Sequence, residues 1–259
     1  KMGADYVFDT VFSAELTIME EGTEFVKRFT SGELKDRPMF TSCCPGWLRF
    51  IKSQYPHLVK YLSSAKSPQQ MFGAVMKTYY AKQLGVSPEK IFTVSVMPCV
   101  AKKGEGELDL FHEEYAGKDV DVVITTRELV KMIRAAHISP DILVDRASDS
   151  PMKAGTGAGI IFGATGGVME AALRSAYFLI KGENPPVEAF KSVRAEGFNE
   201  NNGVQEATFH IDDIAVRTAV VSGLGNTRVL LDRIERGEVQ YRSYGMSGRL
   251  CRRRWSADS

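Results

Sequence analysis

The sequence predicts an α/β fold in which helices flank a mainly parallel sheet. β-branched runs alternate along the chain with segments that carry helix-starting and helix-ending residues, a pattern typical of layered α/β proteins. A chain of 259 residues with 44% hydrophobic residues can bury a substantial core, in one large domain or in two lobes. No internal repeat or low-complexity tract interrupts the pattern.

Helices are predicted first. Two of them lie at residues 13–29 and 47–55. A third is predicted from its first residues: Ser67 is the N-cap, Pro68 takes the first helical position, and Gln70 closes a capping box. Because glycine commonly follows the last turn of a helix, this one is expected to stop at Gly85.

Strands and helices then alternate. The β-branched run at residues 91–96 predicts a buried strand, and Cys99 lies just past its C-terminal end, where parallel sheets bind ligands. The remaining predicted elements are a strand at 119–125, a helix at 126–136, a glycine-rich segment at 155–167, a helix at 168–179, two strands that can pair at 204–211 and 214–221, and a helix from 224 to about 237.

The composition excludes several kinds of protein. A net charge of +1 argues against nucleic acid or an anionic membrane as partner, and no run of about 18 apolar residues predicts a membrane-spanning helix. Four cysteines in so long a chain are no disulfide scaffold and fit a reducing compartment, so the expected location is the cytoplasm. Residues 1–4 are not typical of a natural start, so the chain is expected to begin inside a domain.

Three cysteines stand in two short motifs. Cys43 and Cys44 lie in T-S-C-C-P-G-W at residues 41–47, and Cys99 lies in M-P-C-V-A-K-K-G-E at residues 97–105. Adjacent cysteines cannot close an ordinary disulfide, and neither motif has the C-x-x-C spacing of a zinc ribbon. One hypothesis is that one thiolate binds a metal while its neighbour stays free for acid–base chemistry. The alternative is that these cysteines are small buried hydrophobic residues.

These motifs resemble two of the three signature motifs of the iron-only hydrogenases, TSCCPxW and MPCxxKxxE, and match them at every specified position. The resemblance covers roughly residues 5–241 and includes the stretches 16–22, 63–70 and 162–170. It implies two α/β lobes, each with a mainly parallel sheet flanked by helices, and an active-site cleft between them.

The resemblance also implies a cofactor, the H-cluster. This group pairs a 4Fe-4S cubane with a two-iron subcluster that carries CO, cyanide and a dithiolate bridge. By family analogy, Cys44 and Cys99 are ligands of the cubane, and thiolates suit such clusters because they are soft donors. Cys43 would bind no iron and would pass protons to the amine of the bridge.

Further residues match the family's cofactor pocket. Lys102 would donate a hydrogen bond to an iron-bound cyanide, although a lysine is more often a solvated surface residue. The other matching residues are Met97, Glu105, Phe162, Ser67 and Gln69.

Glu21, Glu24 and Ser63 match the family's proton path to Cys43, with Ser63 between the two carboxylates. Proton transfer needs titratable or hydroxyl groups within hydrogen-bond reach of each other. The alternative is that Glu21 and Glu24, three residues apart on a helix, form only a solvated acidic face.

The family's third motif, M-A-C-x-x-G-C-x-x-G-G-G, supplies the other two cubane ligands and is missing. It is expected shortly after Tyr241, where residues 242–259 form an arginine-rich tail instead. Permitted codons read from Tyr244 one base downstream give Met-Ala-Cys-Pro-Ala-Gly-Cys-Ala-Gly-Gly-Gly-Gly. Residues 1–241 are therefore interpreted as a truncated catalytic domain, and residues 242–259 as a frameshifted third motif.

The resemblance implies reversible reduction of protons to hydrogen, with electrons from ferredoxin and with maturation proteins as further partners. Two alternatives share the fold: a hydrogen sensor, which typically lacks the cysteine matched by Cys43, and an iron–sulfur assembly relative, which lacks the two-iron pocket. A third, a nucleotide-binding domain built on the glycine-rich loops, lacks a complete G-x-G-x-x-G or Walker A motif and leaves the cysteines unexplained. The four histidines show no metal-binding spacing and are interpreted as surface or structural residues.

Overall fold

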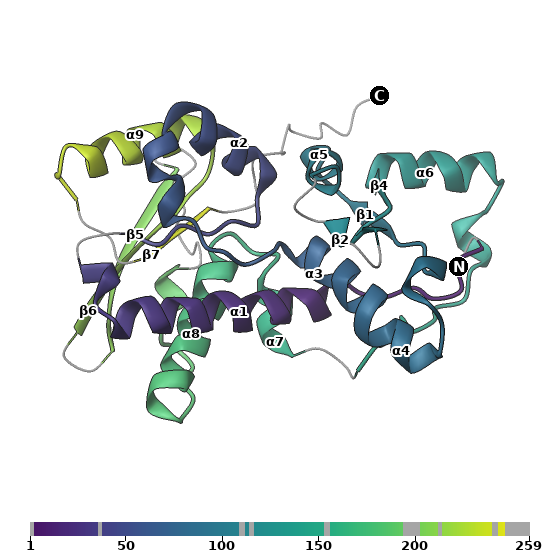
Figure 1. The fold of residues 1–259 in the computed structure, drawn as a ribbon, viewed down its shortest axis with the longest axis horizontal. Helices are drawn as coiled ribbons and strands as arrows, with labels where there is room; N and C mark the ends of the chain where they lie inside the picture. The colour runs from purple at the N-terminus through teal and green to yellow at the C-terminus, as the bar shows by residue number, and fades with distance from the viewer. Residues whose placement is uncertain are drawn as a thin grey trace. The chain divides into compact units, whose positions relative to one another are not determined.

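The computed structural model describes residues 3–35, 38–108, 112–113, 117–152, 156–193, 203–211, 214–239 and 243–246. The chain divides into two compact units (Figure 1). Unit 1 comprises Lys1–Ser13 and Lys66–Gly155, and unit 2 comprises Ala14–Ala65 and Thr156–Ser259. Both units combine helices with strands, which confirms the predicted α/β class.

Unit 2 is built around a three-stranded sheet with the order β5-β6-β7. β5 (Val204–Ile211) and β6 (Ile214–Val221) pair antiparallel along their whole length, with the bounds predicted from the sequence. β7 (Ser243–Met246) pairs parallel to β6, so this sheet mixes both directions. The helices of unit 2 are α1 (Val11–Thr30, from Ala14 on), α2 (Pro45–Gln54), α7 (Gly157–Ile161), α8 (Gly167–Lys181) and α9 (Leu224–Glu235).

Hydrophobic packing holds these helices on the two faces of the sheet. Successive side chains of β6 point to opposite faces: Val221 packs with Trp47 of α2 and Leu231 of α9, whereas Val220 packs with Phe25 of α1 and Leu173 of α8. The first of these clusters fixes the segment that precedes α2, and the second buries one side of α1. Both segments carry predicted site residues.

The glycines before α8 have a packing role. Gly166 has a φ of +81°, which favours glycine. A Cβ atom on Gly167 would lie 1.7 Å from the carbonyl oxygen of Ile161 in α7. Close contact between α7 and α8 therefore accounts for this glycine pair without a bound nucleotide.

Unit 1 contains two short sheets and the pocket motifs. β1 (Val94–Met97) pairs parallel with β4 (Val122–Thr125), and β2 (His112–Glu113) pairs antiparallel with β3 (Gly117–Lys118). α3 (Pro68–Val75) continues through a π-helical turn, η3 (Met76–Tyr80), into α4 (Ala81–Leu84), and Gly85 ends it at a φ of +66° as predicted. The other helices of unit 1 are α5 (Ala101–Gly106) and α6 (Thr126–Ala135).

Two predictions for unit 1 are wrong in part. The strand predicted at 91–96 begins at Val94 and is not buried: Val94 is 52% exposed and Val96 is 41% exposed. Within the described residues β1 pairs only with β4, so this face of the strand lacks a covering layer. The capping box at Ser67 is only half formed. Ser67 accepts from the backbone N–H of Gln70, but the buried Gln70 amide has no partner in the described part of the chain.

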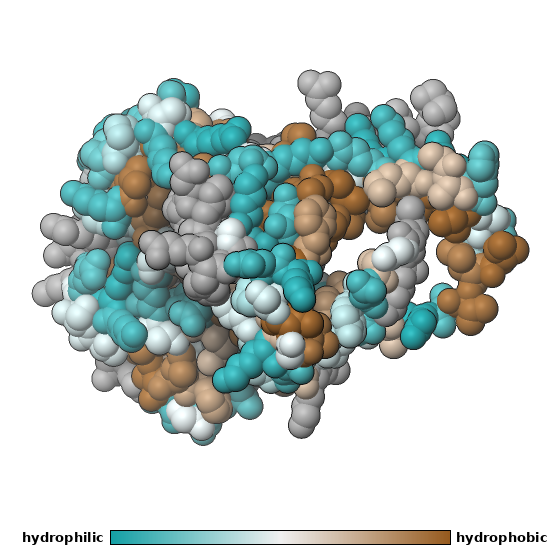
Figure 2. All heavy atoms as spheres, turned by 45° about the vertical axis from the view of Figure 1, so that its right-hand side comes forward, coloured by the Kyte–Doolittle hydropathy of each residue, from teal (hydrophilic) through white to brown (hydrophobic). Residues whose placement is uncertain are grey.

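Figure 2 shows hydrophobic and polar surface interleaved on the face in view. Among the described helices, none combines the length and apolar character that a membrane crossing requires. The predicted tail, residues 242–259, lies outside the described residues except for β7.

Candidate active site

Helix α1 of unit 2 brings two carboxylates to one serine. Glu21 and Glu24 stand three residues apart, so their side chains share a face of the helix. The Ser63 hydroxyl donates to Glu24 Oε2 at 2.7 Å and is also hydrogen-bonded to Glu21. The three residues predicted to form a proton path therefore lie within hydrogen-bond reach of one another.

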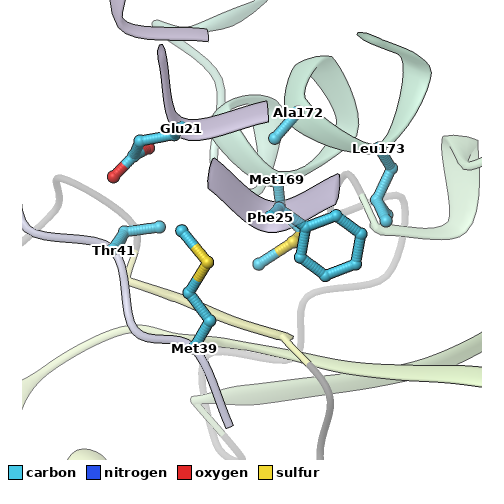
Figure 3. Close-up of a pocket in the computed structure, with 7 residues that line it drawn as sticks. All are labelled: Glu21, Phe25, Met39, Thr41, Met169, Ala172 and Leu173. Carbon is cyan, nitrogen blue, oxygen red and sulfur yellow. The ribbon is translucent and has the colours of Figure 1, made fainter. Parts of the chain in front are cut away.

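Glu21 is the buried member of this group, with an exposed fraction of 4%. It lies at the edge of a small cavity of about 20 Å³ between α1, residues 39–41 and α8 (Figure 3). Burial raises the pKa of Glu21 from 4.5 to about 7, because loss of water disfavours the charged form more than the hydrogen bond from the Ser42 backbone N–H favours it. Glu21 can therefore accept and release a proton near neutral pH.

Glu24 lies in a more polar setting. Its carboxylate accepts from the Ser64 N–H at 3.0 Å and pairs with Arg28 at 2.6 Å. Arg28 also donates to the Leu62 carbonyl at 3.2 Å, which ties α1 to the segment that carries Ser63. Two carboxylates one turn apart thus have different environments, and this difference gives the group a direction for proton transfer.

The Ser63 hydroxyl is arranged to relay a proton between them. A hydroxyl has one proton to donate and two lone pairs to accept with. The Ala65 N–H donates to one lone pair at 3.1 Å, and the proton points to Glu24. Protonated Glu21 can donate to the remaining lone pair, so Glu21, Ser63 and Glu24 can form one continuous hydrogen-bonded chain.

The loop with the two cysteines is held beside this group. Phe40 forms an isolated parallel bridge with Leu62, and the Trp47 indole donates to the Thr41 carbonyl at 3.0 Å. Cys44 is the N-cap residue of α2, at the positive end of the helix dipole, which favours a thiolate. Cys43 directly follows Ser42, whose backbone N–H bonds to Glu21. Neither cysteine is in a disulfide.

Unit 1 carries the second group of predicted residues, centred on Glu105. This carboxylate is 2% exposed and accepts from Ser67 at 3.0 Å, Gln69 at 3.2 Å and Lys102 at 3.0 Å. The side-chain carbonyl of Gln69 accepts from Ser95 at 2.9 Å. Glu105 therefore holds three residues that were predicted to line the cofactor pocket. They are Ser67, the N-cap residue of α3, Gln69 in α3 and Lys102 in α5.

Lys102 and Cys99 flank the start of α5. The Cys99 carbonyl accepts from the Lys102 N–H at 3.2 Å, and Met97 ends β1 two residues earlier. An ammonium has three N–H donors, so Lys102 can keep its bond to Glu105 while it donates to another acceptor. Phe162 is the half-buried C-cap residue of α7 in unit 2.

The donor set fits an iron–sulfur cubane in part. Cys44 and Cys99 are half-buried thiols outside any disulfide, the ligand type that such a cluster requires. A cubane takes four thiolates, and among the described residues no cluster of three or more Cys, His, Asp or Glu forms a metal site. Cys44 therefore offers one such thiolate in unit 2, and Cys99, with Lys102 three residues later, offers another in unit 1.

Sequence reasoning missed three residues that the structure brings to the site: Ser42, Arg28 and Ser95. Ser42 lies inside the T-S-C-C motif and could have been singled out there. Arg28 follows Glu24 by four residues, a spacing typical of helical ion pairs, and this signal was available. Ser95 had no such signal, because its bond to Gln69 joins residues 26 positions apart.

Glu21→Gln is expected to raise the free energy of unfolding at pH 8 by up to about 3 kcal/mol and to change little near pH 4. Between pH 4.5 and about 7 folded Glu21 keeps a proton that the unfolded chain has released. The stability contributed by this group is thus complete below pH 4.5 and is lost as the pH rises through 7, whereas glutamine has no proton to lose. Urea unfolding at several pH values measures the difference.

The exposed neighbour Glu20 gives a matched control. Glu20→Gln removes a carboxylate from the same helix but not from the buried site, so its pH dependence should match that of the parent chain. If Glu21→Gln also showed the parent's pH dependence, Glu21 would not be a protonated buried acid at pH 6.

Comparison with known proteins identifies relatives of the whole chain. The family model described as iron only hydrogenase large subunit, C-terminal domain, matches residues 1–251. The NADP-reducing hydrogenase subunit HndD of Solidesulfovibrio fructosivorans is 48% identical over 242 residues, which are 92% of this chain and 40% of that protein. The chain therefore spans less than half the length of this relative.

A solved structure and a more distant relative complete the comparison. A variant of FeFe-hydrogenase HydA1 from Chlamydomonas reinhardtii matches with a TM-score of 0.81 and 35% identity, over 99% of this chain and 72% of that one. The cytosolic Fe-S cluster assembly factor narfl of Xenopus tropicalis is 31% identical over 253 residues, which are 93% of this chain and 51% of that protein. The similarity thus extends to hydrogenases and, at lower identity, to an assembly factor.

Proposed function

Because the chain belongs to the iron-only hydrogenase large-subunit family, we propose that it forms the catalytic domain of an enzyme that reversibly reduces protons to hydrogen. The observation that carries this proposal is the hydrogen-bonded group Glu21–Ser63–Glu24 beside the loop with Cys43. A proton path that ends at a thiol is what proton reduction requires of the protein. An assembly factor that handles clusters has no need of such a path.

Bound in the site, an H-cluster would supply the redox chemistry by which two protons and two electrons give one hydrogen molecule. Cys44 and Cys99 would hold its cubane, and Met97, Ser67, Gln69 and Phe162 would line its pocket. Lys102, held by Glu105, would place a positive charge against the ligands of the two-iron subcluster. A third-motif segment would have to supply the other two thiolates.

This chain's own residues would move the proton. Glu24 would take it up from the outer end of the path and pass it through the Ser63 hydroxyl to Glu21, and Glu21 would pass it to the Cys43 thiol. A pKa of about 7 suits Glu21 to this role, because at neutral pH it is half protonated and can act in both directions. Hydrogen oxidation would run the same steps in reverse.

Two alternatives share the fold. A hydrogen sensor is disfavoured by Cys43, which such proteins typically lack. An iron–sulfur assembly protein is disfavoured by the combination of Lys102 and Met97 with a formed proton path. The electron donor is proposed to be ferredoxin or a similar carrier, with maturation proteins as partners for cluster insertion, and the cytoplasmic location remains a prediction.

With the third motif restored, the chain is expected to evolve hydrogen from reduced ferredoxin and from reduced viologen. Anaerobic reconstitution with cubane and two-iron cofactor, followed by gas chromatography, measures this directly. A matched Glu24→Gln variant should bind the same amount of iron and evolve hydrogen about 100-fold more slowly, because its proton path is interrupted. A protein that binds full iron but makes no hydrogen with either donor would favour the sensor or assembly function instead.

A further inference from the structure

The serine before the two cysteines bonds in two directions. The Ser42 hydroxyl donates to the Ala65 carbonyl at 2.8 Å, and the Ser42 N–H donates to Glu21. Only 8% of Ser42 is exposed, so few water molecules can compete for these bonds. We call residues 41–44 the cysteine loop and residues 63–65 the relay segment, since Ser63 begins it.

A short backbone ladder joins the two segments just before this point. The Phe40 N–H donates to the Tyr61 carbonyl at 2.9 Å, and the Ser63 N–H donates to the Phe40 carbonyl at 2.7 Å. These two bonds are the parallel bridge between Phe40 and Leu62. A longer parallel pairing would continue with bonds from the next N–H groups on each side.

Each of those next N–H groups bonds instead to a side chain of the proposed proton path. The Ser42 N–H bonds to Glu21, and the Ala65 N–H bonds to the Ser63 hydroxyl at 3.1 Å. The backbone ladder therefore stops where the path begins. The Ser42 hydroxyl bond to the Ala65 carbonyl joins the cysteine loop to the relay segment at this point.

We propose that Ser42 is a positioning residue whose hydroxyl replaces the missing backbone bond and holds the cysteine loop, and with it the Ser42 N–H, against Glu21 and the relay segment. A path of hydrogen bonds conducts only while its members stay within reach of one another. The catalytic consequence rests on the proposed function, but the bond itself can be tested in the 259-residue chain without any cluster.

The groups around Glu21 define the expected signal. Glu24 faces it from its own helix, the Ser42 N–H from the cysteine loop and Ser63 from the relay segment. α8 contributes only uncharged side chains to the cavity beside Glu21: Met169, Ala172 and Leu173. Since a hydrogen bond from Ser42 favours the ionised form, a loop that drifts away should raise the pKa of Glu21 further.

Ser42→Ala is expected to raise the apparent pKa of Glu21 by about 0.5 to 1 unit. Infrared titration of the cluster-free chain measures it from the carboxylic C=O band, which is assigned by its absence in Glu21→Gln. Ser42→Thr retains the hydroxyl and should keep the parent's value. Ser53→Ala is the matched control, because Ser53 is exposed on α2 and its hydroxyl bonds only to near neighbours on that helix, the Phe50 carbonyl and the Gln54 side chain.

A second measurement keeps the test independent of whether the threonine of Ser42→Thr fits the buried position of Ser42. In Ser42→Ala, hydrogen exchange of the peptide that contains the cysteine loop should become about tenfold faster, and in Ser53→Ala it should not change. Unchanged exchange, or an unchanged or lowered pKa in Ser42→Ala, would overturn the proposal. Neither measurement depends on hydrogen evolution or on a bound iron cluster. An inactive enzyme would therefore refute the proposed function and leave this inference standing.

Discussion

Cys43→Ala, in the matured chain with its third motif restored, is expected to keep its iron and to lose hydrogen evolution by about 100- to 10,000-fold. The thiol is the proposed last proton donor, and alanine has no proton to give. Cys43 directly follows Ser42, which bonds to Glu21, so the proposed path ends at this thiol. Iron analysis and hydrogen evolution with reduced viologen measure the two quantities.

Cys44→Ala is the matched comparison, because it removes the same thiol one residue later. It should lower the iron content, since Cys44 is the proposed cubane ligand at the start of α2. The two assignments would have to be exchanged if Cys43→Ala lost iron and Cys44→Ala kept it. Full hydrogen evolution by Cys43→Ala would refute the proposed path.

The 259-residue chain itself is expected to make no hydrogen, even when it is supplied with cubane and two-iron cofactor. By analogy with the family's third motif, this chain lacks two of the four thiolates that would hold a cubane. Cys251 is a single residue in an arginine-rich sequence without the glycines of the third motif, so it is a poor substitute. Metal binding is coupled to folding, so this chain should also be less stable than the restored one.

Side-by-side reconstitution of the two chains provides the test, with iron per chain and hydrogen evolution as readouts. Sequencing of the coding DNA near residues 241–244 tests the cause separately: a one-base change should restore the third motif. Comparable activity of both chains would show that the third motif is dispensable here. A confirmed reading frame without the motif would exclude a frameshift.

Local sequence patterns predicted much of the fold. The alternation of β5 and β6 predicted both strands with their observed bounds, because adjacent antiparallel strands are set by near neighbours in the sequence. Gly85 ended its helix where expected, since glycine, which has no Cβ atom, adopts the positive φ of a helix end without steric cost. The Ser67 cap joins residues within a single helical turn, and its N–H bond formed, whereas the buried Gln70 side chain was positioned by packing and did not complete the box.

Burial was the property that the sequence could not supply. The β-branched run before Cys99 has the composition of a core strand, yet Val94 and Val96 are exposed, because burial depends on which layers cover a sheet. Glu21 and Glu24 are the same residue type on one helix, but Glu21 is the one enclosed by α8 and the segment before the cysteines, and this burial raises its pKa to about 7.

By itself, the sequence determined the α/β class, the family, and the residues that can carry its chemistry, because motifs and short-range periodicity are written in neighbouring positions. The tertiary structure alone decided which of these residues work together. Ser63 reaches Glu24 across 39 positions, and Ser42 reaches Ala65 across 23. Such contacts form only when hydrophobic packing brings distant segments together and removes water from between them, and that same removal of water sets the proton affinity of Glu21.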